Sequence, residues 1–409
     1  MPSEKWLSIV GIGESGLADL SLAARGLVDR STIVVGGKRH LAMLAPEDRR
    51  QQIVWTSPIE DSIASILKYR GTPVCILASG DPLCYGIGVT LLRHISIEQM
   101  TIIPAPSTFS LMCARLGWSL TDVETLSLCG RAPDFVSAML APGAKLLILS
   151  AGAATPQIVA DLLIQRGYGD SRMTVLEHLS GEHERSISGI ARSWAKQDVA
   201  ALNAIAIECA IQSGITPLNR LPGLPDSAYH HDGQLTKREV RSITLAALAP
   251  MPGELLWDVG AGCGSIGIEW LRSHPQCSAI AIEQNDRRLQ FISDNMAALG
   301  TPHLQLVQGK APAVLKDLPT PDAIFIGGGT TSAGLLDTCW MALRSGGRLV
   351  ANAVTIDSEF QLLQWQQQVG GELTRIAIQR TQPIGNFLGW KPMIPVTQLV
   401  VTKTASSPG

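Results

Sequence analysis

The sequence has few charges, few aromatic residues and no strong charge of either sign. Of its 409 residues, 17% are charged, 5% are aromatic and 45% are hydrophobic, and the mean hydropathy is +0.19. A chain of this composition is globular and not disordered. The formal net charge of -2 gives no electrostatic footprint for nucleic acid or for an anionic membrane.

The cysteines also exclude several classes of protein. The chain has 8 cysteines, scattered and without a C-x-x-C pair, which argues against a disulfide framework and against a structural zinc site. We therefore expect a reducing compartment and no metal. Residues 1–5 lead directly into an apolar strand and do not show the arrangement of regions that is typical of a signal peptide. No uncharged apolar run is long enough to span a membrane. We expect a soluble, cytoplasmic protein.

The length indicates at least two domains. The best candidate boundary is a stretch rich in proline and glycine that begins at Gly214. We therefore predict a first domain over residues 1–213, a linker over 214–234 and a second domain over 235–409.

The most informative motif lies in the second domain. An apolar strand, Leu255–Val259, runs into the spacing D-x-G-x-G-x-G between Asp258 and Gly264, and an apolar-periodic helix follows. Glycines are required where the backbone turns sharply and approaches a ligand that a Cβ would block. Asp258 at this turn would repel a pyrophosphate but suits a cationic group, such as the ammonium of S-adenosylmethionine.

A second strand, Ser278–Glu283, ends in an acid that is well placed to accept hydrogen bonds from ribose hydroxyls. Together these features predict a methyl-donor site. The alternatives are a nucleotide fold of another kind and a glycine loop without a ligand.

In the first half, Trp6–Val10 forms a strand that leads into a second glycine-rich turn, and we expect a helix from Asp19 to Val28 with Asp19 as its N-cap. Short strands then alternate with helices, which predicts a largely parallel α/β sheet whose strand ends hold the ligand. From Leu146 the pattern becomes strand-rich, with a helix near Gln157 to Arg166, and predicts a second subdomain.

The second half carries seven predicted strands, with an antiparallel pair at the end. Besides the two above, they lie at residues 304–307, 322–326, 347–351, 373–376 and 397–401. This count fits a class I methyltransferase sheet. Ahead of the strands, Thr236 and Glu239 have the spacing of a capping box at a helix start.

The motifs of both halves resemble enzymes of vitamin B12 synthesis. The second half resembles the decarboxylating tetrapyrrole methyltransferases in Thr236–Arg241, in the glycine loop, in Gly309–Pro312 and in Ile326–Thr330. The signature of amino-directed nucleic-acid methyltransferases is absent from the last of these strand ends. The first half resembles the tetrapyrrole methylase superfamily in the segments Val10–Gly13, Gly36–Leu41, Ala78–Pro82, Pro104–Ser107 and Leu116–Trp118.

The order of the two halves resembles that of the fused precorrin-6Y methyltransferases, which act at carbons 5 and 15 and remove a carboxyl group. The resemblance implies an α/β protein with a two-subdomain tetrapyrrole methylase fold (class III methyltransferase) followed by a Rossmann-like class I methyltransferase sheet of seven strands. It also implies a homo-oligomer, a tetrapyrrole substrate that becomes precorrin-8 and one S-adenosylmethionine per half.

The resemblance further implies which residues bind the cofactor. In the second half they are Thr236, Gly260, Ala261, Gly262, Cys263, Gly264, Glu283 and Ala311, with Asp258 behind the loop. In the first half they are Gly11, Gly13, Gly80, Asp81, Pro82 and Ser107. The chain departs from the superfamily at Glu14–Ser15, where proline is frequent, and at Cys263, where serine or threonine is common.

Methyl transfer from a sulfonium is an in-line displacement that needs alignment and exclusion of water, so we expect no catalytic dyad. The substrate carries many carboxylates, which basic residues would bind. The candidates are Lys38, Arg39, Arg131, Lys237, Arg238 and Arg241. For each of them, the alternative is an ordinary surface charge exposed to solvent. Three histidines, His40, His178 and His183, are weighed as proton carriers against structural roles.

Two other functions stay open at this point. In the first alternative, one half is a binding or assembly module that only retains the fold. In the second, the chain is an RNA or protein methyltransferase with an accessory domain. The sequence leaves open whether the substrate holds cobalt, which half acts first and whether an intermediate passes between the sites.

Overall fold

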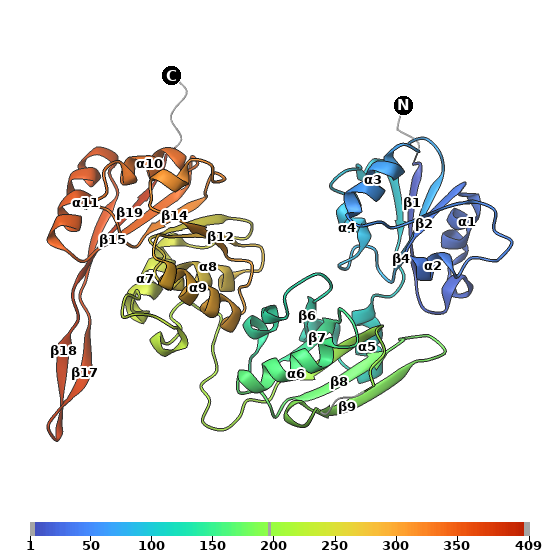
Figure 1. Cartoon of the computed structure of the whole chain (residues 1–409), viewed down its shortest axis with the longest axis horizontal. Coiled ribbons are helices and arrows are strands. Elements are labelled where there is room, and N and C mark those ends of the chain that lie inside the picture. The colour runs from blue at the N-terminus through green and yellow to red at the C-terminus, as the bar shows by residue number, and fades with distance from the viewer. Residues whose placement is uncertain (1–4, 195–197, 405–409) are drawn as a thin grey trace. The chain divides into compact units, whose positions relative to one another are not determined.

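The computed structural model describes residues 5–194 and 198–404, which form two compact units. The first unit holds the chain up to Ile215 without Asp134–Leu140, and the second holds that segment and the chain from Thr216. Figure 1 shows the chain from its N-terminal to its C-terminal elements. Across the described residues, no helix combines the length and the apolarity that a membrane crossing requires.

The first unit begins with a five-stranded sheet in the order β3-β2-β4-β1-β5, and all its pairs are parallel. This confirms the parallel α/β sheet predicted from the alternation of strands and helices. The strands are β1 (Leu7–Ile12), β2 (Ile33–Gly36), β3 (Gln51–Val54), β4 (Val74–Ser79) and β5 (Met100–Ile103). The helices are α1 (Leu22–Arg30), α2 (Lys38–Leu41), α3 (Ile59–Leu67), α4 (Ile87–Leu91) and α5 (Thr108–Leu116).

A second sheet completes this unit, in the order β6-β7-β10-β8-β9, with antiparallel pairs except between β6 and β7. Its elements are β6 (Glu124–Ser127), β7 (Lys145–Leu149), α6 (Thr155–Gln165), β8 (Arg172–Glu177), β9 (Arg185–Ile190) and β10 (Asn203–Glu208). The strand-rich subdomain is therefore confirmed, and β6 is the strand that the sequence pattern did not reveal.

The second unit is built on a seven-stranded sheet in the order β13-β12-β11-β14-β15-β19-β16. The first five strands are parallel, and β16 and β19 form the antiparallel pair that the sequence predicts. Strand β19 lies between β15 and β16 and is antiparallel to both. The strands are β11 (Leu255–Val259), β12 (Ser278–Glu283), β13 (Gln305–Gln308), β14 (Ala323–Ile326), β15 (Arg348–Ala353), β16 (Glu372–Ile376) and β19 (Val396–Thr402). The helices are α7 (Arg238–Leu248), α8 (Ser265–Ser273), α9 (Asp286–Ala298), α10 (Leu335–Ala342) and α11 (Ile356–Val369).

Alternate residues of the central strands pack into two separate cores. Leu256 and Phe325 face the core beneath α7, α8 and α9, whereas Trp257 and Ile324 face the core beneath α10 and α11. This is the period-two pattern of strands that are buried on both faces of the sheet.

A two-stranded hairpin, β17 (Gln379–Ile384) and β18 (Phe387–Pro392), is inserted between β16 and β19. Figure 1 shows it as a long ribbon that stands clear of the sheet. The sequence does hold a signal for it, because Gly385–Asn386 is a two-residue glycine turn between two extended segments.

Two expected helix starts are wrong. Helix α1 begins after Ser21, whose side chain accepts from the Ala24 amide, and Asp19 belongs to a short 3-10 turn instead. Helix α7 has Lys237 as its N-cap without a side-chain cap bond, so Thr236 and Glu239 form no capping box. The Glu239 carboxylate pairs with Arg380 of the hairpin, a partner that the local sequence does not reveal.

Candidate functional site

The glycine loop of the second unit joins the carboxyl end of β11 to the start of α8. Gly260, Gly262 and Gly264 all have positive φ angles, of 73°, 60° and 79°. A Cβ on Gly260 would lie 3.1 Å from the backbone nitrogen of Gly328. The loop therefore requires glycine for its backbone conformation and, at Gly260, for close approach to the loop that follows β14.

Glu283 ends the neighbouring strand β12, and its buried carboxylate organises this edge of the sheet. It accepts hydrogen bonds from the amides of Gly262 (2.9 Å), Gln284 (2.9 Å) and Asn285 (3.0 Å). An ionised carboxylate has about four lone-pair sites. The arrangement holds the glycine loop in place and leaves acceptor capacity for one ligand hydroxyl.

Asp258 lies behind the glycine loop and is 1% exposed. Its Oδ2 accepts from the Gly267 amide at 2.9 Å, whereas its Oδ1 has no hydrogen-bond partner among the described residues. Burial raises the pKa of this carboxyl to about 7, against the lowering effect of the Gly267 bond. Asp258 does not line the cavity described next, so in this geometry it supports the loop from within.

A cavity of about 920 Å³ opens along the carboxyl ends of β12, β11, β14 and β15. Open α/β sheets bind their ligands at this edge. Of the predicted cofactor residues, the cavity is lined by Thr236, Gly260, Ala261, Gly262, Cys263, Glu283 and Ala311. Gly264 is outside the lining, where its αL conformation begins α8.

Other lining residues were not predicted. Gly327, Gly328 and Gly329 follow β14, and Asn352 and Val354 lie at the end of β15. Three more, Arg380, Gln382 and Lys391, come from the hairpin. The glycines stand in a motif that the sequence does display, whereas the hairpin residues carry no local signal because their place at the cavity depends on tertiary packing.

The predicted substrate cations of the second unit have different environments. Lys237 lines the cavity. Arg238 is largely exposed and pairs with the adjacent Glu239.

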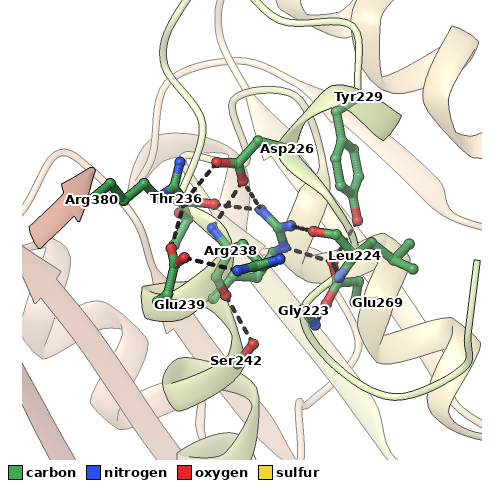
Figure 2. A network of polar contacts seen from close by, with 11 residues as sticks. Gly223, Leu224, Asp226, Tyr229, Thr236, Arg238, Glu239, Ser242, Glu269 and Arg380 are labelled. Atoms are coloured by element: carbon green, nitrogen blue, oxygen red, sulfur yellow. Dashed lines mark hydrogen bonds and ion pairs between the residues drawn. The ribbon is translucent and has the colours of Figure 1, made fainter. Parts of the chain in front are cut away.

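Arg241 is 0% exposed, and the prediction that it binds substrate is wrong. Its Nε donates to Glu269 at 2.6 Å, its other nitrogens reach Asp226 and the carbonyls of Thr236 and Leu224, and its guanidinium lies 4.8 Å from the centre of the Tyr229 ring. Figure 2 shows these partners gathered in one network.

Part of the predicted linker belongs to the same network. Leu224 and Tyr229 are buried in the core of the second unit. Glu269 on α8 accepts from the amides of Gly223 (2.6 Å) and Leu224 (3.1 Å) and from the Tyr229 hydroxyl (2.8 Å). The segment therefore packs onto the second unit, because its backbone donors and apolar side chains find partners there.

The first unit holds a smaller cavity of about 340 Å³. Asp81 and Ser107 line it, whereas Gly11, Gly13, Gly80 and Pro82 do not. A Cβ on Gly11 would lie 2.0 Å from the Gly80 carbonyl oxygen, so this glycine lets the end of β1 pack against the loop after β4. Pro82 follows Asp81 in the same loop, and a Cβ on Gly13 would meet open space.

The predicted cations of the first unit do not line this cavity. Lys38 is exposed. Arg39 pairs with Glu14 and donates to the Ser79 hydroxyl at 3.2 Å. Arg131 lies 5.1 Å from the centre of the Tyr85 ring, and Tyr85 does line the cavity.

Glu14, where the chain departs from the superfamily pattern, ties the loop after β1 to the second sheet. Besides Arg39 it contacts His178 Nδ1, at 3.1 Å, beyond the end of β8. His40 lines the cavity and accepts at Nε2 from Arg39 at 3.0 Å, because a guanidinium has no acceptor. Burial and the nearby Arg39 charge lower the pKa of His40 to about 4, so it is neutral at physiological pH.

Comparison with known proteins assigns both halves to described families. Residues 7–193 match the tetrapyrrole (corrin/porphyrin) methylases, and residues 227–403 match the precorrin methyltransferase domain. A precorrin-6Y C(5,15)-methyltransferase [decarboxylating] from Sinorhizobium sp is 48% identical, with 97% of this chain and 96% of that protein covered. A protein of the same name from Mycobacterium tuberculosis is 42% identical, with 97% and 99% covered. A cobalt-precorrin-7 C(5)-methyltransferase from Salmonella typhimurium is 35% identical over 44% of this chain and 88% of its own length.

Proposed function

The chain belongs to the family of the decarboxylating precorrin-6Y C(5,15)-methyltransferases, and from this we propose that it methylates precorrin-6Y at carbons 5 and 15 and decarboxylates the ring C acetate to give precorrin-8. In this proposal the first domain methylates carbon 5, and the second methylates carbon 15 and removes the carboxyl group. The observation that carries the proposal is the large cavity of the second unit, whose lining contains seven of the predicted cofactor residues.

The residues of this cavity fit S-adenosylmethionine, the methyl donor of the family. Gly260 leaves space that a Cβ would fill, and Glu283 keeps acceptor capacity on the cavity side. S-adenosylmethionine supplies an electrophilic methyl group on its sulfonium. The glycine loop and Glu283 would bind and orient it, and Thr236, Cys263 and Ala311 would complete its site.

The rest of the lining supports a reaction that depends on alignment. Leu235, Val240, Val259 and Phe325 give the cavity apolar walls that exclude water from the bound reactants. Among the described residues that line it, Glu283 is the sole acid, and its carboxylate is engaged by backbone amides. Methyl transfer requires no paired acid and base, because a ring carbon of the reduced macrocycle is the nucleophile. Decarboxylation releases an electron pair that the macrocycle accepts, and a proton then takes the place of the lost carboxyl group.

In the first unit we propose a second S-adenosylmethionine site in the smaller cavity. Asp81 and Ser107 on its wall, and the Gly11–Gly80 contact behind it, support this placement. A cavity in each unit, lined by seven predicted cofactor residues in the second and by Asp81 and Ser107 in the first, favours two active domains over one active domain with a binding module. The homo-oligomer stays a prediction. Analytical ultracentrifugation of the intact chain tests it by measuring the mass of the assembly.

The test is mass spectrometry of the product formed by the intact chain from precorrin-6Y and S-adenosylmethionine. We expect two added methyl groups and the loss of one carbon dioxide. In the intact chain at limiting S-adenosylmethionine, Glu283→Ala should strongly lower the decarboxylation and one methylation and leave the other. One methyl group with every carboxyl retained would contradict the proposal and indicate that one domain only binds.

A further inference from the structure

The charges that line the second-unit cavity are unbalanced. Over the part of the chain that the structure describes, its lining holds five basic residues and a single acid, Glu283. The basic residues are Lys237, Arg288, Lys310, Arg380 and Lys391. The cavity is therefore cationic and suits a ligand with several carboxylates.

Two of these cations already have partners. Arg288 pairs with Asp232 at 2.9 Å. Arg380 pairs with Asp226 at 3.0 Å and Glu239 at 2.5 Å, which anchors the base of the hairpin to the start of α7 (Figure 2). Within residues 5–194 and 198–404, Lys237, Lys310 and Lys391 have no ion-pair partner, so their charges remain for a ligand.

Strand registers place the hairpin at the same sheet edge as the glycine loop. Ala353, at the carboxyl end of β15, pairs with Thr397 near the start of β19. Val396, which starts β19, pairs with Ile376, which ends β16. The hairpin between them therefore leaves the sheet at its carboxyl edge, on the β15 side, whereas Glu283 marks the opposite, β12 side of the cavity.

One face of the hairpin points to the cavity. Arg380 pairs with Lys391 across the two strands, the next pair on this face is Gln382 with Gly389, and the third is Ile384 with Phe387. Arg380, Gln382 and Lys391 all line the cavity. A Cβ on Gly389 would lie 2.2 Å from Ile384 Cδ1, so the Ile384 side chain folds back over this glycine.

The face thus changes from cationic to apolar along its length. Lys391 lies at the base, whereas Ile384 and Phe387 near the tip are 65% and 80% exposed. A tetrapyrrole has the complementary pattern, with an apolar ring face and charged carboxylate arms. Neither residue lines the cavity, but both continue the hairpin face whose base does. The opposite face also exposes Leu388 and Trp390, so continuity with Lys391, and not exposure alone, assigns this face to a ligand.

We propose that this face of the hairpin binds the tetrapyrrole substrate, with Lys391 pairing with a carboxylate arm and Ile384 and Phe387 lying against the ring. The inference rests on the proposed function and adds to it the wall that recognises the substrate. In this arrangement the cofactor occupies the Glu283 side of the cavity and the substrate occupies the hairpin side.

The experiment uses the intact chain with Lys391→Met and, as a matched control, Lys316→Met, since Lys316 is exposed but does not line the cavity. Carbon dioxide release measures KM for the precorrin, and calorimetry measures Kd for S-adenosylmethionine. Loss of one charge-assisted hydrogen bond should raise KM about 10- to 100-fold in Lys391→Met. The control should stay within about twofold, and Kd for the cofactor should be unchanged in both variants.

A second pair of variants tests the apolar part. Phe387→Ser changes the cavity-side face, whereas Leu388→Ser changes the opposite face at a similarly exposed residue, 73% against 80%. We expect KM to rise several-fold in Phe387→Ser only. Sedimentation of both variants separates this role from assembly.

Three results would overturn the inference. An unchanged KM in Lys391→Met, with decarboxylation by the wild-type chain intact, would show that the hairpin does not bind the substrate. The proposed function would be unaffected by that result. A weakened cofactor Kd in that variant would assign the lysine to the cofactor. An altered oligomeric mass in Phe387→Ser without a change in KM would assign the face to a second copy. If the wild-type chain transfers no methyl group, the proposed function falls first.

Discussion

Asp258 and Glu283 are carboxylates on neighbouring strands of one sheet, and their surroundings give them different roles. Glu283 accepts three backbone amides and lines the cavity, whereas Asp258 accepts one amide and is enclosed behind the glycine loop. Three backbone donors fix the Glu283 carboxylate at the cavity wall, whereas Oδ1 of Asp258 has no hydrogen-bond partner among the described residues. Glu283 therefore suits ligand binding, and Asp258 suits support of the loop.

The raised pKa of Asp258 predicts a pH-dependent stability. Its pKa is about 7 in the folded protein against an ordinary value of 3.8, so the folded state binds a proton more tightly. The stability from this group is complete below about pH 4 and is lost as the pH rises towards 7. An asparagine side chain would mimic the neutral acid, so the stability of Asp258→Asn relative to wild type should rise between about pH 4 and pH 7 and stay constant above pH 7.

Urea unfolding of both proteins at several pH values, without ligand, measures this difference. The expected gain is a few kcal/mol at most, since about 1.4 kcal/mol corresponds to each pKa unit. A difference that does not change with pH would show that Asp258 has an ordinary pKa in the folded protein.

For Glu283 we predict an effect on the cofactor. Glu283→Ala removes the acceptor that holds the Gly262 amide and the acceptor that faces the ligand, so Kd for S-adenosylmethionine should rise at least about 10-fold. Calorimetry on the intact chain measures it. Glu372→Ala, at an exposed position on β16, is the control and should bind as wild type does.

At the scale of elements, the network around Arg241 and Glu269 joins helices α7 and α8 to the segment that precedes them. Both side chains are almost fully buried, and Glu269 accepts from Gly223, Leu224, Tyr229 and Arg241. Burial and the charge of Glu269 raise the pKa of Tyr229 well above its ordinary value, so its hydroxyl remains a donor. The network positions the start of α7, whose N-cap Lys237 lines the cavity.

Removal of Arg241 should therefore destabilise the second unit strongly. Arg241→Met leaves the Glu269 charge buried without its cation, and such a loss costs about 3–5 kcal/mol. Arg238→Met, three residues earlier on the exposed side, should cost less than about 0.5 kcal/mol. Urea unfolding monitored by tryptophan fluorescence measures both, and similar costs would mean that the buried pair is not an anchor.

At the scale of the whole molecule, two compact units each contain their own sheets, cores and cavity. The hydrogen bonds to Glu269 show that the chain from Gly223 to Tyr229 belongs to the second unit. A boundary that separates the chain into two folded domains must therefore lie before Gly223.

This predicts that fragment 216–409 folds with higher stability than fragment 232–409. The shorter fragment lacks Leu224 and Tyr229, which are 1% and 5% exposed, and leaves Glu269 and Arg241 without several partners. Circular dichroism should show a lower Tm and a less cooperative transition for 232–409. Equal Tm values would mean that the segment from Gly223 to Tyr229 does not contribute to the stability of the second unit.

Much of this architecture follows from local sequence. The seven strands of the second sheet, the glycine loop and the acid at the end of β12 are visible because strand periodicity and glycine spacing are properties of contiguous residues. The glycine loop and Glu283 are predictable at the cavity for the same reason, since the carboxyl ends of parallel strands meet at one edge, whereas Thr236 and Ala311 were expected only from the family resemblance.

Other features depend on residues far apart in the chain, and only the tertiary structure decided them. The local sequence suggests that Arg241 is an exposed cation. The structure shows that it is paired with Glu269, which is 28 residues away in the chain. Lys391 reads as a surface charge until the strand registers bring the hairpin to the cavity. The sequence by itself determined the elements and the loops that bind a ligand, because local periodicity encodes them. Which charges are buried and paired, and which remain available to a substrate, was decided by tertiary packing, because burial and pairing depend on long-range contacts.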